Sequence, residues 1–306
     1  MRIGILTAAN HHIGSFRLRA DVVTRELRGF GHSVYVGPTL LDDRDVQIRT
    51  KMWEGKSEAL LEAKEKGQAI VFDLCDDHSA REGWREQTAP VVEAADVLTA
   101  GSIYIAELFR REFNRRAIVV EDAYEEAEAP ASYSPGERMR ALWYGHNTNA
   151  KPVLALAPEI ERRATLRTVC NANLPGVDCR QWSPAAQEQA LAWCDVVVIP
   201  VNLEDKVPNG LAKTAARVVG ALRRGKFPIA GRIASYEQFE KWIYLGDIIE
   251  GLDWIKSQPR QEILNRIEHA QSYVRATFSP RHIAKHWERV CIAALAARKK
   301  MSAVEA

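Results

Sequence analysis

The densest group of side chains able to do acid–base chemistry follows one short apolar run. Residues 69–73 are apolar until the last, and Asp76, Asp77 and His78 follow within five residues of that end. Carboxylates and imidazoles can take a proton from a hydroxyl, and clustered carboxylates can instead hold a divalent cation. His11, in the polar loop after residues 3–7, is a further candidate base. These four residues are our candidate catalytic residues; the alternative is a set of solvated charges beside a helix start.

Glycines and basic side chains mark places suited to phosphate oxygens. Gly145 directly follows the apolar run 139–144, and glycine lets the backbone approach a phosphate closely. The N–H groups at the following helix start favour anions. Lys213 and Arg217 are four residues apart, so a helix over 212–224 places them on one face, where they suit a diphosphate. The alternative is that both are ordinary surface cations.

The elements that position these residues alternate between strands and helices. In the first half, strands are expected at 3–7, 32–36, 69–73, 96–99 and 117–120, with helices at 17–29, 58–66, 90–95 and 102–113. In the second half, strands are expected at 139–144, 166–170, 195–200 and 227–230, with helices at 152–163, 185–193 and 212–224. Such alternation predicts parallel sheets covered by helices. Ligands of these sheets bind outside the carboxyl ends of the strands.

A stretch rich in Pro, Ser, Gly and Glu interrupts the alternation at residues 125–137 and is typical of a linker. The expected fold class is α/β, with two Rossmann-like domains facing each other across a cleft. The predicted domains are residues 1–130 and 138–280. A last helix, residues 281–306, is expected to pack back on the first domain.

Composition limits the class of protein. The chain of 306 residues has 42 basic and 40 acidic residues, a net charge of +2, which argues against a dedicated nucleic-acid binder. Its five cysteines form no CxxC pair, as is typical of reduced thiols in a cytoplasmic protein. No signal peptide and no apolar run of ~18 residues is present, so we expect no integral membrane segment. The helical pattern that ends at Arg298, Lys299 and Lys300 leaves peripheral membrane contact open.

Residues 213–228, followed by Ser235, Tyr236 and Glu237, resemble the donor-binding segment of GT-B-fold nucleotide-sugar glycosyltransferases, in particular those similar to group 1. Those proteins carry a Lys, an Asn or Arg, a helix, a Gly and a Pro before a strand, and then a loop with a tyrosine. Segments beginning at Ser15, at residue 73 and at Trp143 also resemble the group, as does the region from Gly246 onward.

This resemblance implies that the C-terminal domain binds a nucleoside-diphosphate sugar and the N-terminal domain binds the acceptor. The implied donor-binding residues are Gly145, Asn147, Asn149, Lys206, Asn209, Lys213, Arg217, Tyr236 and Glu237. The implied acceptor-side residues are Ser15, Arg17 and Arg19, although Ser15 would also serve as a helix N-cap. No metal and no cofactor beyond the donor co-substrate is expected.

One position departs from the family pattern. Many retaining members have a Glu seven residues after the Lys, where it holds the ribose, and Gly220 stands there in this chain. Either another acid serves, such as Glu237, or nucleotide binding differs from that of the family. The expected activity is transfer of a hexosyl or pentosyl group, with retention favoured over inversion.

The alternatives are a nucleotide-sugar epimerase or hydrolase, and a degenerate protein that binds nucleotide without turnover. A dehydrogenase is disfavoured because the first strand is not followed by GxGxxG. The acceptor stays open among a polysaccharide, a lipid-linked sugar, a protein, a small molecule and a modified nucleic acid.

Overall fold

A computed structural model describes residues 1–7, 11–50, 57–201 and 210–305. The chain divides into two compact units, and each contains one six-stranded sheet. Unit 1 consists of Met1–Glu125, Val207–Thr214 and Thr277–Ala306. Unit 2 consists of Glu126–Lys206 and Ala215–Ala276. The chain thus leaves unit 1 and returns to it twice.

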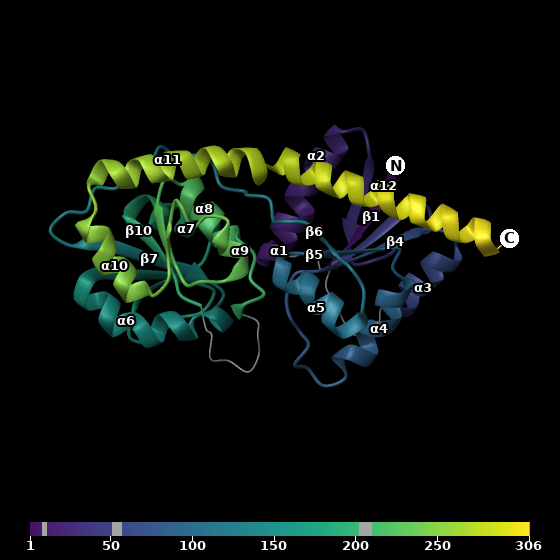
Figure 1. The fold of residues 1–306 in the computed structure, drawn as a ribbon, viewed down its shortest axis with the longest axis horizontal. Helices are drawn as coiled ribbons and strands as arrows, with labels where there is room; N and C mark the ends of the chain where they lie inside the picture. Colours follow the sequence, from purple (N-terminus) through teal and green to yellow (C-terminus); the bar gives the residue numbers. More distant parts are fainter. Residues whose placement is uncertain (8–10, 51–56, 202–209, 306) are drawn as a thin grey trace. The chain divides into compact units, whose positions relative to one another are not determined.

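Unit 1 is a parallel sheet with helices on both faces (Figure 1). Its strands are β1 (Arg2–Leu6), β2 (Ser33–Gly37), β3 (Val46–Thr50), β4 (Ala69–Leu74), β5 (Val97–Ala100) and β6 (Ile118–Val119). Its helices are α1 (Gly14–Phe16), η1 (Arg17–Asp21), α2 (Val22–Gly29), α3 (Ser57–Glu65), α4 (Trp84–Ala94), α5 (Ile103–Phe113) and α12 (Pro280–Glu305). The strand order is β2-β1-β3-β4-β5-β6, with every pair parallel.

Two apolar clusters fill the two faces of this sheet. On one face, Ile3, Val71 and Val120 pack with α2 and with Ile283 and Trp287 of α12. On the other face, side chains of β4 and β5 pack with α3, α4 and α5. A strand covered on both faces reads as a continuous apolar run, and all six residues of β4 are buried.

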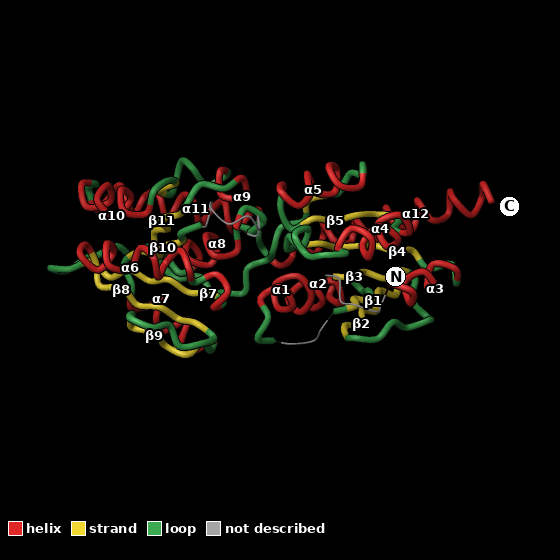
Figure 2. The backbone as a smooth tube through the Cα atoms, turned by 90° about the horizontal axis from the view of Figure 1, so that it is seen from below, coloured by secondary structure: helices red, strands yellow, loops and turns green. Residues whose placement is uncertain are grey.

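Unit 2 repeats the architecture with a different strand order. Its strands are β7 (Met139–Gly145), β8 (Ala164–Cys170), β9 (Asp178–Gln181), β10 (Val196–Ile199), β11 (Phe227–Ala230) and β12 (Tyr244–Leu245). Its helices are η2 (Asn147–Asn149), α6 (Lys151–Arg163), α7 (Pro184–Trp193), α8 (Ala216–Arg223), α9 (Ala234–Glu237), α10 (Ile248–Ser257) and α11 (Arg260–Thr277). The parallel sheet has the order β12-β11-β10-β7-β8-β9. Figure 2 shows helices on both sides of the strands within each unit.

The segment predicted as a linker is packed on unit 2. The backbone N–H groups of Ala129 and Ser132 donate to the carbonyls of Arg223 and Gly225, both at 2.9 Å. Gly225 has φ +67°, and a Cβ atom there would stand 2.0 Å from the carbonyl oxygen of Pro130. The segment shows no helical or strand periodicity because its backbone groups bond to the turn between α8 and β11 instead.

The predicted alternation of strands and helices is confirmed in both units, and three strands were missed, among them the two-residue strand β12. β3 has buried polar side chains, Gln47 and Arg49, and β9 is a polar edge strand, so neither reads as an apolar run. Two local predictions were wrong. The helix expected from residue 212 begins at Ala216, and the first helix begins at Gly14 without a side-chain cap, so Ser15 lies inside it.

Candidate functional site

Each sheet has one place where the strand order reverses, and open parallel sheets bind ligands at the carboxyl ends of the strands there. In unit 2 the order reverses between β7 and β10, and in unit 1 between β1 and β3. The loops after these strands therefore define the candidate site of each unit.

The loop after β7 is fixed by an amide at the end of the neighbouring strand. Oδ1 of Asn171 accepts the backbone N–H of Asn147 at 2.8 Å, and its Nδ2 lies 3.3 Å from Oδ1 of Asn147. Nε2 of His146 lies 3.2 Å from the same Nδ2 atom. These contacts hold the turn that includes Asn149. Sequence reasoning missed Asn171, although an Asn directly after a strand was a usable signal.

Gly145, the last residue of β7, leaves room for two side chains. A Cβ atom at this position would stand 3.1 Å from the ring of Trp143 and 3.8 Å from Nη1 of Arg217. Gly145 therefore also has a structural role, because the ring of Trp143 packs where its side chain would otherwise lie. The guanidinium of Arg217 lies beside the carboxyl end of β7, where the sequence predicts a diphosphate.

Arg217 and Lys213 do not share a helix face, contrary to the sequence prediction. α8 begins at Ala216, so Arg217 is in its first turn and Lys213 precedes it. Residues 210–214 belong to unit 1, where the hydroxyl of Thr214 donates to Asp122 at 2.6 Å and the hydroxyl of Ser102 donates to the carbonyl of Ala212 at 3.1 Å. These contacts hold the backbone out of the helix.

Gly220 is the position where the family pattern has a Glu, and a different acid occupies its surroundings. A Cβ atom at Gly220 would stand 2.7 Å from Oε1 of Glu126 and 3.0 Å from the hydroxyl of Tyr144. The buried hydroxyl of Tyr144 donates to the carbonyl of Arg217 at 3.1 Å. Burial, and then the charge of Glu126, raise the pKa of Tyr144 well above its usual value. The carboxylate at this point of unit 2 is therefore that of Glu126.

Tyr236 and Glu237 lie on α9 and have different environments. Tyr236 is fully buried, and burial raises its pKa, while the neighbouring guanidinium of Arg217 offsets part of that rise. Glu237 is exposed. The sequence indicates Glu237 as a possible substitute for the absent Glu at position 220, whereas the side chain that fills the space beside Gly220 is Glu126.

In unit 1, the side chains after β4 have separate roles. Both oxygens of the buried Asp77 are engaged, because Oδ1 accepts the N–H of Ser79 at 2.8 Å and Oδ2 accepts the hydroxyl of Tyr104 at 3.1 Å. Asp76 is partly exposed and lies 3.5 Å from Nζ of Lys213. His78 is also partly exposed. Asp77 thus has a structural role in unit 1, and Asp76 and His78 are the two less buried side chains of the three.

Arg19 is inside unit 1, where it cannot meet an acceptor. Its guanidinium donates to both oxygens of Asp73, at 2.6 and 2.9 Å, and to Asp122 at 2.9 Å. Although burial acts in the opposite direction, the two carboxylates raise the pKa of Arg19 well above its usual value. The expectation of acceptor contact for Arg19 is therefore corrected, because the side chain is fully enclosed.

The other residues of this region lie nearer the surface. Arg17 is bonded to Glu125 at 2.9 Å and to the carbonyl of His11 at 2.8 Å. His11 is exposed and meets the ring of Phe16 edge-on at 4.9 Å. Ser15 is partly exposed on α1. These contacts hold the loop residue His11 against the start of the helix.

Arg49, at the end of β3, is a residue that sequence reasoning did not find. It is 1% exposed, and burial lowers its pKa to about 10. It lies at the strand where the order of the sheet reverses, so it is a further candidate for the site of unit 1. Two other predicted residues, Lys206 and Asn209, lie outside the described residues.

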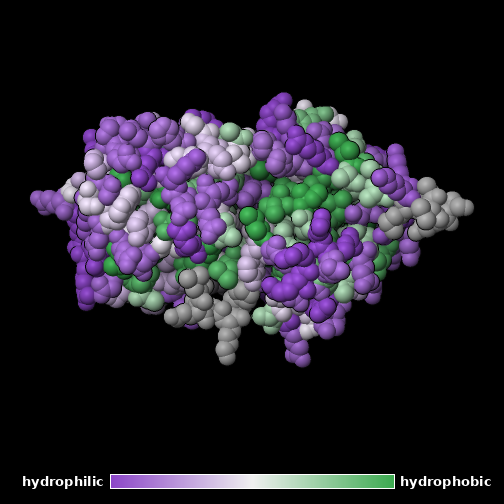
Figure 3. All heavy atoms as spheres, in the orientation of Figure 1, coloured by the Kyte–Doolittle hydropathy of each residue, from purple (hydrophilic) through white to green (hydrophobic). Residues whose placement is uncertain are grey.

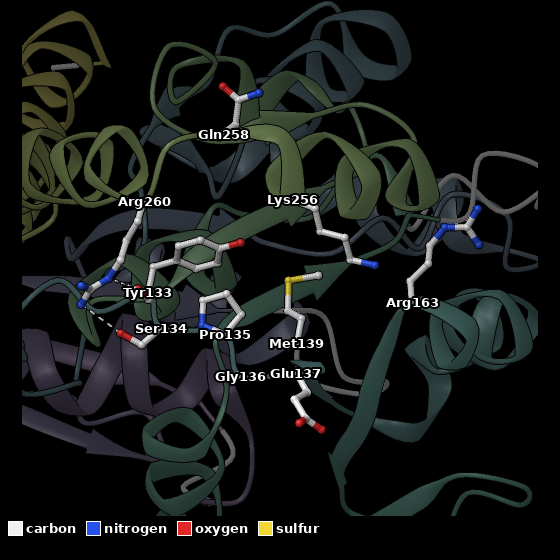
Figure 4. Close-up of a pocket in the computed structure, with 10 residues that line it drawn as sticks. All are labelled: Tyr133, Ser134, Pro135, Gly136, Glu137, Met139, Arg163, Lys256, Gln258 and Arg260. Carbon is white, nitrogen blue, oxygen red and sulfur yellow. Dashed lines mark hydrogen bonds between the residues drawn. The ribbon is translucent and has the colours of Figure 1, made fainter.

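A cavity of about 540 Å³ lies in unit 2 at the amino end of β7, the end opposite to Gly145 (Figure 4). Met139, the first residue of β7, lines it together with Lys256 and Arg163. Arg260 is turned toward Ser134, to which it donates at 3.0 Å. Because β7 is seven residues long, this cavity is roughly 20 Å from Gly145 and is separate from the candidate site.

Within the described ranges, no three His, Cys, Asp or Glu side chains converge as a cation site requires. In the same part of the chain, no helix has both the length and the apolar character needed to cross a bilayer.

No protein-family model matches the chain, and no curated protein matches it in sequence. Solved structures do match. One described as trehalose-6-phosphate from E. coli bound with UDP-2-fluoro glucose aligns with TM-score 0.69 and 9% identity, over 95% of this chain and 99% of that one. The lipopolysaccharide outer core galactosyltransferase WaaB aligns with TM-score 0.61 and 11% identity, over 96% and 99%. TarM aligns with TM-score 0.59 and 11% identity over 80% of this chain, which spans 54% of TarM.

These structures share the arrangement of two parallel-sheet α/β units. The chain has the GT-B fold.

Proposed function

We propose that the chain is a metal-independent glycosyltransferase that moves a sugar from a nucleoside-diphosphate sugar to an acceptor hydroxyl. The observation that carries the proposal is the guanidinium of Arg217 beside Gly145 at the carboxyl end of β7, together with the carboxylate of Glu126 beside Gly220 of α8, the helix that also carries Arg217. The carboxyl end of such a strand is the place in a parallel sheet where a nucleotide binds. The fold is also that of the galactosyltransferase WaaB and of the solved structure described as bound with UDP-2-fluoro glucose.

Arg217 is assigned to the leaving diphosphate. Its guanidinium stands beside Gly145, in the first turn of α8, where the N-terminal N–H groups add partial positive charge. A charge that develops on the leaving oxygens is stabilised by donors that are already in position. This arrangement needs no metal ion.

Glu126 is assigned to the hydroxyls of the nucleoside ribose. Its carboxylate occupies the space beside Gly220 and faces the hydroxyl of Tyr144. A carboxylate accepts hydrogen bonds from two adjacent hydroxyls, which is the role that the family resemblance gives to a Glu at position 220. In this chain the acid comes from the segment before β7 instead of from α8.

Asp76 and His78 are assigned to the acceptor side. Nζ of Lys213 lies 3.5 Å from the carboxylate of Asp76. We propose that the transfer retains configuration, so that the departing phosphate takes the acceptor proton and no protein base is required. If the product is inverted, Asp76 or His78 is the base.

The binding test is a thermal-shift series with UDP, GDP, ADP, CMP and NAD. One nucleoside diphosphate at about 100 times its dissociation constant should stabilise the chain by about 2.7 kcal/mol. Glu126→Gln removes a charged hydrogen-bond partner and should weaken that binding by roughly ten- to a hundredfold. Glu125→Gln, at the adjacent position in unit 1, is the matched control and should leave binding unchanged. Stabilisation by NAD alone would refute the donor assignment.

Product analysis separates the remaining activities. Incubation of the matching nucleotide sugar should give nucleotide release that depends on an added acceptor. Free sugar without acceptor would identify a hydrolase, and an isomerised donor an epimerase. Binding with no product at all would identify a degenerate nucleotide-binding protein.

A further inference from the structure

The outer face of α12 is strongly basic. Its inner face packs in the core of unit 1 through Ile283, Trp287 and Val290. Its exposed cations are Arg281, Lys285, Arg289, Lys299 and Lys300. Glu288 is the one acidic residue in the sequence between positions 280 and 300, and it is bonded to His32 at 2.8 Å.

These cations form a line along the helix. Positions 281, 285, 289, 292, 296 and 299 follow the spacing of three to four residues that brings side chains to one face. At 1.5 Å per residue, the line from Arg281 to Lys299 is roughly 27 Å long. Within the described residues, Lys285, Arg289 and Lys299 have no ion pair, so their charge is available to a partner.

Exposed apolar side chains lie on the same side of unit 1. Ile292 is 53% exposed in the middle of the basic line, and Ile118 of the edge strand β6 is 47% exposed. Val120 packs in the cluster that contains α12, and side chains two apart on a strand share a face, so Ile118 is directed to the α12 side of the sheet. Figure 3 shows a hydrophobic area where Figure 1 places β5 and β6 beside α12.

We propose that this face of unit 1, formed by the outer side of α12 and by Ile118, docks on an anionic lipid surface. Charge complementarity favours this occupant, because a straight row of cations can meet the phosphates of a flat surface simultaneously. Ile292 and Ile118 enter the boundary between headgroups and acyl chains, as the apolar residues of interfacial helices do. The docking surface is independent of the strand-end site proposed above.

The size of the effect follows from the charges. Each Lys or Arg beside an anionic membrane surface contributes a factor of about five in partitioning. Loss of three cations should therefore weaken binding by on the order of 100-fold at low salt. Salt should weaken the binding of the wild-type chain as well, because exposed charges are screened.

The experiment is cosedimentation of the full chain with vesicles of phosphatidylcholine, with and without phosphatidylglycerol. The test variant is Lys285→Gln/Arg289→Gln/Lys299→Gln. The matched control is Arg180→Gln/Lys241→Gln/Lys256→Gln, which removes the same charge from exposed positions of unit 2. We expect the wild type and the control to bind the vesicles with phosphatidylglycerol, and the test variant to lose about two orders of magnitude. All three proteins should melt at similar temperatures.

A second variant tests the apolar part. Ile292→Ser keeps every charge and should lower binding at raised salt more than at low salt. The proposal is overturned if test and control variants bind the anionic vesicles equally. It is also overturned if the wild type ignores the vesicles and binds a duplex RNA, which would make the basic line a nucleic-acid surface.

Discussion

Arg19→Met is the sharpest test of the interior of unit 1. The substitution removes the cation that neutralises Asp73 and Asp122, and the side chains of Arg19 and Asp73 are fully enclosed. Removal of one partner of a buried ion pair leaves an uncompensated charge and costs about 3–5 kcal/mol. At roughly 2–4 °C per kcal/mol for a domain of this size, the melting temperature of unit 1 should fall by roughly 6–20 °C.

Arg17→Met is the matched control. It makes the same change two residues earlier on the same helical segment, where the ion pair with Glu125 is partly exposed. A pair of this kind contributes about 1 kcal/mol or less. Differential scanning calorimetry of both variants measures the contrast. A loss at Arg19 no larger than at Arg17 would show that the buried network does not stabilise the unit, and the reasoning would be refuted.

Three further perturbations have defined outcomes. Burial raises the pKa of Cys194 and Cys291 to about 12, so above pH ~9 both thiols ionise only in the unfolded chain. The free energy of unfolding should therefore fall as the pH rises from ~9 to ~12. The double variant Cys194→Ala/Cys291→Ala should reduce the slope of this fall by up to about 2.7 kcal/mol per pH unit. An unchanged slope in urea unfolding at alkaline pH would contradict this. Asp247→Ala removes the carboxylate that accepts two backbone N–H groups at the start of α10 and should cost about 1 kcal/mol in urea unfolding. Gly225→Ala introduces a Cβ atom against a backbone carbonyl at positive φ and should cost more than about 2 kcal/mol, whereas a neutral effect would show that the turn can move.

Local pattern in the sequence determined the class of fold. Buried strands such as β10 are continuous apolar runs, and β4 is one apart from Asp73; such runs are typical of a parallel sheet covered on both faces. β3 was not predictable in this way, because Arg49 and Gln47 are polar and their burial depends on neighbours distant in sequence. The strand order also required the structure, since spacing along the chain does not specify which strands pair.

The residues of the candidate site also divide into those that the sequence reveals and those whose positions only the structure reveals. Gly145 and Arg217 could be named from the sequence, because a glycine after a strand and a cation near a helix start are local features. The position of Lys213 could not, because the contacts of Thr214 with unit 1 override the helical pattern around it.

The surroundings of Glu126 and Arg19 could not be predicted from the sequence either. The carboxylate beside Gly220 comes from a segment far away in sequence, and Arg19 points into a pair of buried carboxylates instead of toward solvent. Residue types and their spacing reveal which groups can do chemistry. Tertiary packing alone decides which of them meet, because the free energy of a buried charge depends on partners that the chain brings together only when it folds.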